Sequence, residues 1–268
     1  SSCSASNGRL ELMVNDNGNI SVSDPQTGML FVGLNQLVFD RDIGDGWNYV
    51  KPQGTAMQVA GGVVQSISVV TDGPAETVFE AVTRYTLPRE MVFAGGILEN
   101  YEGVRESADL SELVVKATYT LAANSPEVNV KLDFTNTIKD YRVRMVMPTP
   151  IKGDYYAYQN FAVLKRKPGR EKGRATENWL ESEPLEKNFS RLAWKRDKQG
   201  GLAFIAKEGL HEISANDDGD LMVTLLRAFR RTVHTNGEID GQLLKPLHYE
   251  YAFRVIAPKD ITASAYLQ

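Results

Sequence analysis

The sequence predicts an all-β protein, a large antiparallel β-sandwich, and three observations carry this prediction. Apolar and polar residues alternate with a period of two through most of the chain. Turns rich in Gly, Asn, Asp and Pro interrupt this alternation at short intervals, and no convincing amphipathic helical pattern stands beside it. A strand that alternates in this way buries one face, so two sheets of such strands bury their apolar faces by packing against each other.

The predicted strands follow one another closely along the chain. Residues 9–14 and 20–24 flank the turn sequence NDNGN and form a predicted hairpin. Proline ends two later strands, residues 77–87 before Pro88 and residues 141–147 before Pro148. The other predicted strands cover residues 29–32, 63–70, 113–121, 128–134, 202–206, 211–215, 221–226 and 248–256.

Composition and charge favour an ordinary globular protein. With 268 residues, 42% of them hydrophobic, the chain can bury a core of normal size. A net charge of −4 offers no basic field for nucleic acid or an anionic membrane, and no apolar run has the roughly 18 residues of a membrane span. Cys3 is the single cysteine, so no disulfide forms within the chain. We therefore expect neither nucleic acid nor a membrane as partner, and a reducing, cytoplasmic location.

The domain organisation is predicted to be simple. Residues 1–8 read as a disordered leader or cloning remnant, because they have neither a charged start nor an apolar stretch. Residues 9–268 form the sandwich domain, with two sub-sheets that meet near residues 160–178. The basic run at residues 164–174 is expected to be a solvated loop, since it lacks the interleaved aromatic residues of a nucleic-acid site.

A search for chemistry gives no catalytic residue and no metal ligand. The three histidines, His211, His234 and His248, match no zinc-binding spacing. No G-x-S-x-G, P-loop or G-x-G-x-x-G motif is present. A pair of carboxylates for glycoside hydrolysis stays open as an alternative, because the 34 acidic residues offer many pairs.

The best candidate site is the loop DRDIGDGWNYVKPQG at residues 40–54. Asp45, Trp47, Asn48 and Tyr49 place a carboxylate, an amide and two aromatic rings within five residues. Aromatic faces cover the C–H side of a sugar ring, and Asp or Asn bonds its hydroxyl groups. The alternative is a loop whose aromatic residues close one end of the sandwich, and the residues alone do not choose between the two.

Four stretches in the same order resemble the C-terminal β-sandwich region of glycoside hydrolase family 38 α-mannosidases of the bacterial type. The first, residues 7–52, contains V-N-x-x-G-x-I-x-V-x-D-x-x-T-G and ends in the loop GDGWNY. The second covers residues 128–151 (VNVKLDFTNTIKDYRVRMVMPTPI), and the third covers residues 177–213 with the segment GLAFIAKEGL. The fourth joins LMVTLLRAF at 221–229 to GQLLKPLHYEYAF at 241–253.

This resemblance implies a supersandwich of the galactose-mutarotase type that packs behind a catalytic barrel. The barrel would hold the zinc ion, the nucleophile and the acid/base of a retaining mechanism on α-mannosides. This chain then carries no zinc and is inactive alone. Its expected partners are an α-mannoside or manno-oligosaccharide and the barrel of the same polypeptide, and self-association stays open.

The resemblance also implies substrate-binding residues. In the loop the family commonly has a tyrosine as first aromatic residue where this chain has Trp47, which exchanges a hydroxyl for a donor-only indole N–H. Arg227 matches the arginine of an L-L-R segment, with an ion pair at a strand end as its alternative role. Gln242, in the segment Gly241-Gln242-Leu243, is the remaining candidate.

Two other functions are kept beside this one. A stand-alone carbohydrate-binding sandwich would bind sugar through Trp47 without any partner. A mutarotase-like enzyme shares the architecture and needs a histidine and an acid that face one sugar. His234 or His248 with Glu250 would be that pair.

Overall fold

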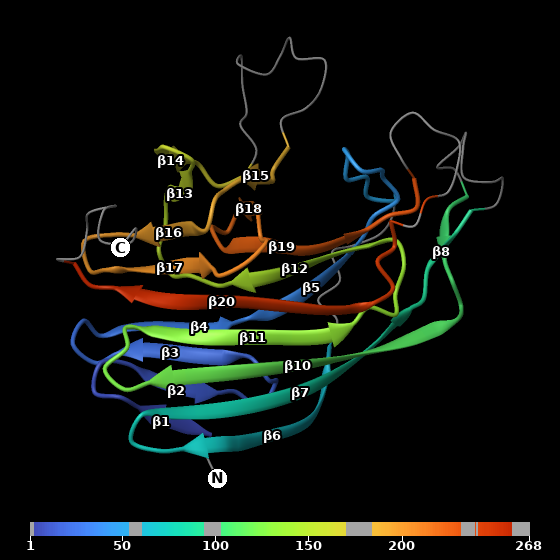
Figure 1. The fold of residues 1–268 in the computed structure, drawn as a ribbon. Coiled ribbons are helices and arrows are strands. Elements are labelled where there is room, and N and C mark those ends of the chain that lie inside the picture. Colours follow the sequence, from blue (N-terminus) through green and yellow to red (C-terminus); the bar gives the residue numbers. More distant parts are fainter. Residues whose placement is uncertain are drawn as a thin grey trace.

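The structure, a computed structural model, describes residues 3–53, 61–93, 103–169, 184–231, 239 and 241–258. These residues form twenty strands and no helix (Figure 1). Every pairing between neighbouring strands is antiparallel, in sheets of nine, five, four and two strands. The predicted all-β antiparallel sandwich is confirmed. Among the described residues no helix is long and apolar enough to cross a membrane.

The larger layer is the nine-stranded sheet, ordered β14-β13-β16-β17-β20-β11-β10-β7-β6. Its longest strands, β7 and β10, have 13 residues each and pair along their full length. The strands are β6 (Val63–Asp72), β7 (Glu76–Pro88), β10 (Leu110–Ala122), β11 (Glu127–Thr135), β13 (Tyr155–Gln159), β14 (Ala162–Arg166), β16 (Leu192–Arg196), β17 (Gly201–Ala206) and β20 (Pro246–Ile256).

The second layer consists of two smaller sheets that one stretch of chain connects. The four-stranded sheet contains β1 (Ser4–Ser6), β2 (Glu11–Val14), β3 (Ile20–Asp24) and β4 (Met29–Leu34). The five-stranded sheet, ordered β15-β18-β19-β12-β5, contains β5 (Gln36–Arg41), β12 (Tyr141–Met147), β15 (Lys187–Asn188), β18 (Glu212–Ala215) and β19 (Leu221–Ala228). Only Asn35, with a left-handed φ of 69°, separates β4 from β5. The short strands β8 (Met91–Val92) and β9 (Arg105–Glu106) pair separately.

One continuous hydrophobic core joins the two layers. On β7 and β10 every second side chain is buried, as the period of two predicts. Phe79 and Tyr119 of the large sheet belong to the same buried cluster as Phe31 and Tyr141 of the smaller sheets. The buried contact between sheets therefore supplies most of the hydrophobic stabilisation.

Two strands are buried on both faces, whereas the sequence predicted strands with one buried face each. Strand β12 alternates apolar residues with arginine, yet all seven of its residues are buried. Strand β5, of which five of six residues are buried, extends into the predicted loop as far as Arg41. A strand covered on both sides need not alternate, which is why the sequence QLVFDR gave no strand signal.

Two parts of the predicted domain organisation are corrected. Residues 4–6 are not a disordered leader, because they form β1 and pair with β2. The side chain of Asn7 also donates to the carbonyl oxygens of Ala122 and Ser125 over 2.7 and 2.9 Å. The described strands on both sides of residues 160–178 belong to the same sheets, so the sheets do not meet at this segment. Residues 170–178, and with them part of the basic run, lie outside the described residues.

Candidate functional site

Residues 42–53 leave the end of β5 and fold beside the end of β19 (Figure 1, blue loop at the upper right and orange strand). We call them the β5 loop. Asp42 is its anchor and is fully buried. Its Oδ1 accepts the backbone N–H groups of Gly44 and Val50 over 3.0 and 3.3 Å. Burial raises the pKa of this carboxyl, and the nearby charge of Arg227 opposes that rise. Asp42 therefore holds the two sides of the loop, at Gly44 and at Val50, together.

Asp45 closes a tight turn inside the loop. Its Oδ1 accepts the backbone N–H groups of Trp47 and Asn48, each over 2.8 Å. Its own N–H donates to the carbonyl oxygen of Asn48 over 3.0 Å. This is the pattern by which an aspartate side chain stabilises a turn. Asp45 is thus engaged in building the loop, and any contact with a ligand is additional to that role.

Gly44 is required by the close approach of the chain to itself. A Cβ atom at this position would lie far inside van der Waals contact with the carbonyl oxygen of Asn48 and 2.8 Å from the nitrogen of Val50. Gly46 is different, since a Cβ atom there would lie 3.6 Å from the ring of Phe229, an ordinary contact. Only the first glycine of the GDG motif is sterically obligatory.

Trp47 and Asn48 lie on the exposed side of the β5 loop. The Trp47 side chain is 77% exposed, the largest exposed aromatic surface on this loop. Its backbone is nevertheless fixed by Asp45. A rigid loop that presents an indole outward is suited to contact a sugar ring or a second protein surface.

Tyr49 faces the opposite way, toward the five-stranded sheet. The guanidinium carbon of Arg142 lies 3.5 Å from the centre of its ring, a cation–π contact. Burial raises the pKa of the Tyr49 hydroxyl to about 12. The predicted pair of aromatic residues is therefore divided, with Trp47 outward and Tyr49 inward.

Beneath Tyr49 lies a buried arginine cluster that sequence reasoning missed: Arg142, Arg144, Asp40 and Glu186. Arg142 and Arg144 bond the same oxygen of Asp40 over 3.2 and 2.7 Å. Glu186 pairs closely with Arg142 and lies 3.7 Å from Arg144. Two positive and two negative groups balance in a region that the β5 loop covers. Burial lowers the pKa of Arg144, and the charge of Arg142 adds to this effect.

Arg227 connects the end of β19 to the β5 loop. Its Nε donates to Oδ2 of Asp42 over 2.8 Å, and its Nη2 donates to the carbonyl oxygen of Asp45 over 2.9 Å. The guanidinium also lies 5.4 Å from the ring of Phe229. The ion pair at a strand end, one of the two roles considered from the sequence, is present, and the arginine holds the loop in place.

Gln242 lies deeper, behind Asp140. Its amide bonds Asp140 twice, from Nε2 to the carboxylate over 2.7 Å and from the backbone N–H of Asp140 to Oε1 over 2.8 Å. Gln242 is 7% exposed, and Arg230 also pairs with the Asp140 carboxylate. The backbone carbonyl of Asp140 accepts the N–H of Asp42 over 2.9 Å. The structure thus brings Gln242 into the support of the β5 loop.

The histidine and glutamate of the mutarotase alternative lie elsewhere. His248 Nδ1 lies 2.6 Å from Asp133 and its Nε2 lies 3.2 Å from Glu250. Lys131 pairs with the same Glu250 over 3.1 Å, on the face of β11 and β20 where the His248 side chain is 46% exposed. His234 lies outside the described residues. Within the described part of the chain, no group of three or more His, Cys, Asp or Glu is arranged to hold a metal.

Comparison with known proteins finds likeness in structure rather than in sequence. No protein-family model and no curated protein sequence matches the chain. The structure superposes on an alpha-mannosidase from Enterococcus faecalis V583 with a TM-score of 0.86 and 18% identity, over 99% of this chain and 31% of that one. A protein in the glycosyl hydrolase family 38 from Enterococcus faecalis gives a TM-score of 0.83 and 18% identity, over 99% of this chain and 32% of that one.

The chain therefore spans about a third of the length of both solved structures. At this level of identity the likeness establishes the architecture. The protein has the β-sandwich fold that forms part of these two Enterococcus faecalis proteins.

Proposed function

We propose that the chain is the β-sandwich part of a family 38 glycoside hydrolase that cleaves terminal α-mannosidic bonds. The carrying observation is the superposition of 99% of the chain on an alpha-mannosidase with a TM-score of 0.86. The four sequence stretches that resemble the family lie in the family's order between residues 7 and 253. In this proposal a catalytic barrel elsewhere in the polypeptide holds the zinc ion and the nucleophile.

The β5 loop borders the sugar site in this proposal. Its backbone is fixed from three directions, by the Asp42 carboxylate, the Asp45 turn and the Arg227 guanidinium. A side chain on such a rigid support binds with little loss of conformational entropy. Trp47 and Asn48 would contact the substrate or the barrel, whereas Tyr49, Arg227 and Gln242 act as positioning residues.

The test uses the full-length enzyme and a nitrophenyl α-mannoside. We expect Trp47→Ala to lower kcat/KM by about tenfold, the effect of losing about 1.4 kcal/mol of transition-state binding. Phe161→Ala is the matched control, because Phe161 is another exposed aromatic residue but lies at the turn between β13 and β14. An unchanged kcat/KM in the Trp47→Ala enzyme would exclude the β5 loop from the sugar site.

The chain by itself is expected to be inactive. Zinc binding in stoichiometric amount, together with cleavage of the same α-mannoside by the 268-residue chain, would contradict the proposal. The exposed Trp47 also favours a second candidate, a carbohydrate-binding sandwich that acts without the barrel. Calorimetry of the chain with methyl α-mannoside separates the two, since only the second predicts heat that Trp47→Ala removes.

A further inference from the structure

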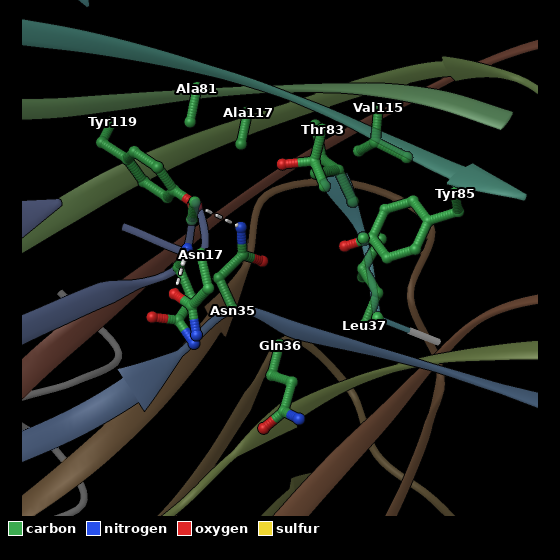
Figure 2. Close-up of a pocket in the computed structure, with 15 residues that line it drawn as sticks. Asn17, Asn35, Gln36, Leu37, Ala81, Thr83, Tyr85, Val115, Ala117 and Tyr119 are labelled. Atoms are coloured by element: carbon green, nitrogen blue, oxygen red, sulfur yellow. Dashed lines mark hydrogen bonds between the residues drawn. The ribbon is translucent and has the colours of Figure 1, made fainter. Parts of the chain in front are cut away.

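A cavity of about 170 Å³, lined by both polar and apolar residues, lies between the two layers, away from the β5 loop (Figure 2). One wall comes from β7 and β10 of the nine-stranded sheet. The other comes from the turn between β2 and β3 and from the junction of β4 and β5. Asn17 and Gly61 are its exposed lining residues, so the cavity opens between them. None of its described lining residues is charged.

The inner end of this interlayer cavity is rigid. Asn35 donates from Nδ2 to the hydroxyl of Tyr119 over 2.8 Å, and that hydroxyl donates to the carbonyl oxygen of Gly18 over 2.7 Å. The hydroxyl of Tyr251 bonds Oδ1 of Asn35 from behind. These bonds fix the Asn35 amide where it faces the cavity (Figure 2).

Two largely buried residues of β7 present hydroxyl groups to the same space. Thr83 is 6% exposed and Tyr85 is 9% exposed, and their side chains make no hydrogen bond with the described residues. Both hydroxyls point into the cavity (Figure 2). Burial raises the pKa of Tyr85 to about 12. Each hydroxyl therefore offers one donor and acceptor oxygens to an occupant of the cavity.

We propose that the interlayer cavity binds a small neutral polyol, of the size class of a monosaccharide, through Thr83, Tyr85 and Asn35. An uncharged lining with both donors and acceptors suits hydroxyl groups and disfavours ions. The cavity is larger than the roughly 30 Å³ that one water occupies and smaller than the roughly 300–1,000 Å³ of drug-sized pockets. The proposal is independent of the function assigned to the β5 loop.

The glycines at the entrance offer a selective block. At Gly62 a Cβ atom would lie 2.8 Å from Cε1 of Tyr85, so a side chain there would displace the ring. At Gly61 a Cβ atom has nothing within 4 Å. Gly61→Phe therefore adds bulk at the opening without a clash at the substituted position.

The experiment measures binding of glycerol and D-mannose to the chain by NMR, with acetate as the charged probe. Saturable binding of a neutral probe and none of acetate is the expected result, and the stronger neutral probe distinguishes polyol from sugar. Thr83→Val and Tyr85→Phe are each expected to weaken binding about five- to tenfold, the worth of one hydrogen bond. Neither should lower Tm, because the hydroxyl removed has no protein partner. Gly61→Phe should abolish binding.

Trp47→Ala distinguishes the two possible binding places. Probe binding in the interlayer cavity should persist in this variant, whereas probe binding at the β5 loop should be lost. Saturable binding that Gly61→Phe leaves unchanged would overturn the proposal. The proposal would also be overturned if neither neutral probe binds at its highest soluble concentration and the cavity holds only ordered water.

Discussion

Arg227 and Asp42 form a hydrogen-bonded ion pair between positions 185 residues apart, with 2.8 Å from Nε to Oδ2. The Asp42 side chain is fully buried and that of Arg227 is 15% exposed. Because the same guanidinium also bonds the carbonyl oxygen of Asp45 over 2.9 Å, one side chain joins β19 to the start of the β5 loop and to the first residue of the turn that carries Trp47. The exposed face of the β5 loop therefore depends on a contact that lies beneath it.

Removal of Arg227 tests this dependence. In Arg227→Met the buried Asp42 carboxylate loses its cation, so we expect the free energy of unfolding to fall by about 3–5 kcal/mol, as for other broken buried pairs. Denaturant unfolding of the 268-residue chain measures it. Arg227→Lys keeps the charge but not the paired donors, so its free energy of unfolding should fall less than that of Arg227→Met. A loss of less than about 1 kcal/mol in Arg227→Met, the scale of an exposed pair, would show that the contact does not hold the loop.

The two glycines of the GDG motif should respond differently to alanine. Gly44→Ala places a methyl group against the Asn48 carbonyl oxygen, so the turn has to open. We expect faster amide hydrogen exchange across the β5 loop and a stability loss of about 1–3 kcal/mol, the usual range for overpacking. Gly46→Ala only touches the ring of Phe229 and is the matched control. Equal exchange rates in the two variants would contradict the steric role of Gly44.

A Gln242 variant tests whether this side chain supports the β5 loop or contacts a ligand directly. Gln242→Leu removes both bonds to Asp140 and leaves a buried polar group without its partner. A loss of about 2–3 kcal/mol in the free energy of unfolding is expected. Gln199→Leu, in an exposed turn, should change stability little. If Gln242→Leu instead keeps full stability and alters only sugar binding, its role lies at a ligand and not in the support of the loop.

The His248 contacts predict a dependence of stability on pH. Hydrogen bonds with Asp133 and Glu250 raise the pKa of His248 above its ordinary 6.5. The stabilisation that protonated His248 contributes is therefore complete at a pH below the pKa of this histidine in the unfolded chain. It is lost as pH rises through the higher pKa of His248 in the folded chain. The His248 side chain is largely solvated, so its contacts should contribute no more than about 1 kcal/mol to the free energy of unfolding.

Comparison of the chain with His248→Gln at acidic and alkaline pH measures this effect. The stability difference should be larger at the acidic value. His211→Gln is the control, since the exposed side chain of His211 makes no hydrogen bond or ion pair with the described residues. A difference that grows as pH rises would contradict the assignment.

Strands whose sequence alternates apolar with polar residues could be predicted from the sequence. Residues 20–24 and 141–147 were predicted with the bounds of β3 and β12, and the ends of β7 and β10 moved by one to three residues. The alternation is a local signal, because each residue reports which face of its own strand meets the core. Strands β13, β14 and β16 gave no such signal, since they are short or covered on both sides.

For the candidate site, the sequence identified the loop but not its construction. Arg227 contacts the predicted loop at Asp42 and Asp45, whereas Trp47 faces outward and Tyr49 faces the buried Arg142. The substrate-binding role of these residues stays a prediction. The residues that hold them were missed. Asp42, Asp140 and Asp40 are ordinary acids in a sequence with 34 of them, and only their burial shows their role.

By itself the sequence determined the strand period, the turns and the polar-aromatic composition of the β5 loop, because these are properties of neighbouring residues. Only the tertiary structure shows that Arg142 and Arg144 are buried, because a strand face with two arginines could equally well be exposed to solvent. Tyr49, Asp40 and Glu186 come from distant parts of the chain to cover and neutralise that face. The same packing directs Tyr49 inward and leaves Trp47 exposed, which local sequence cannot specify.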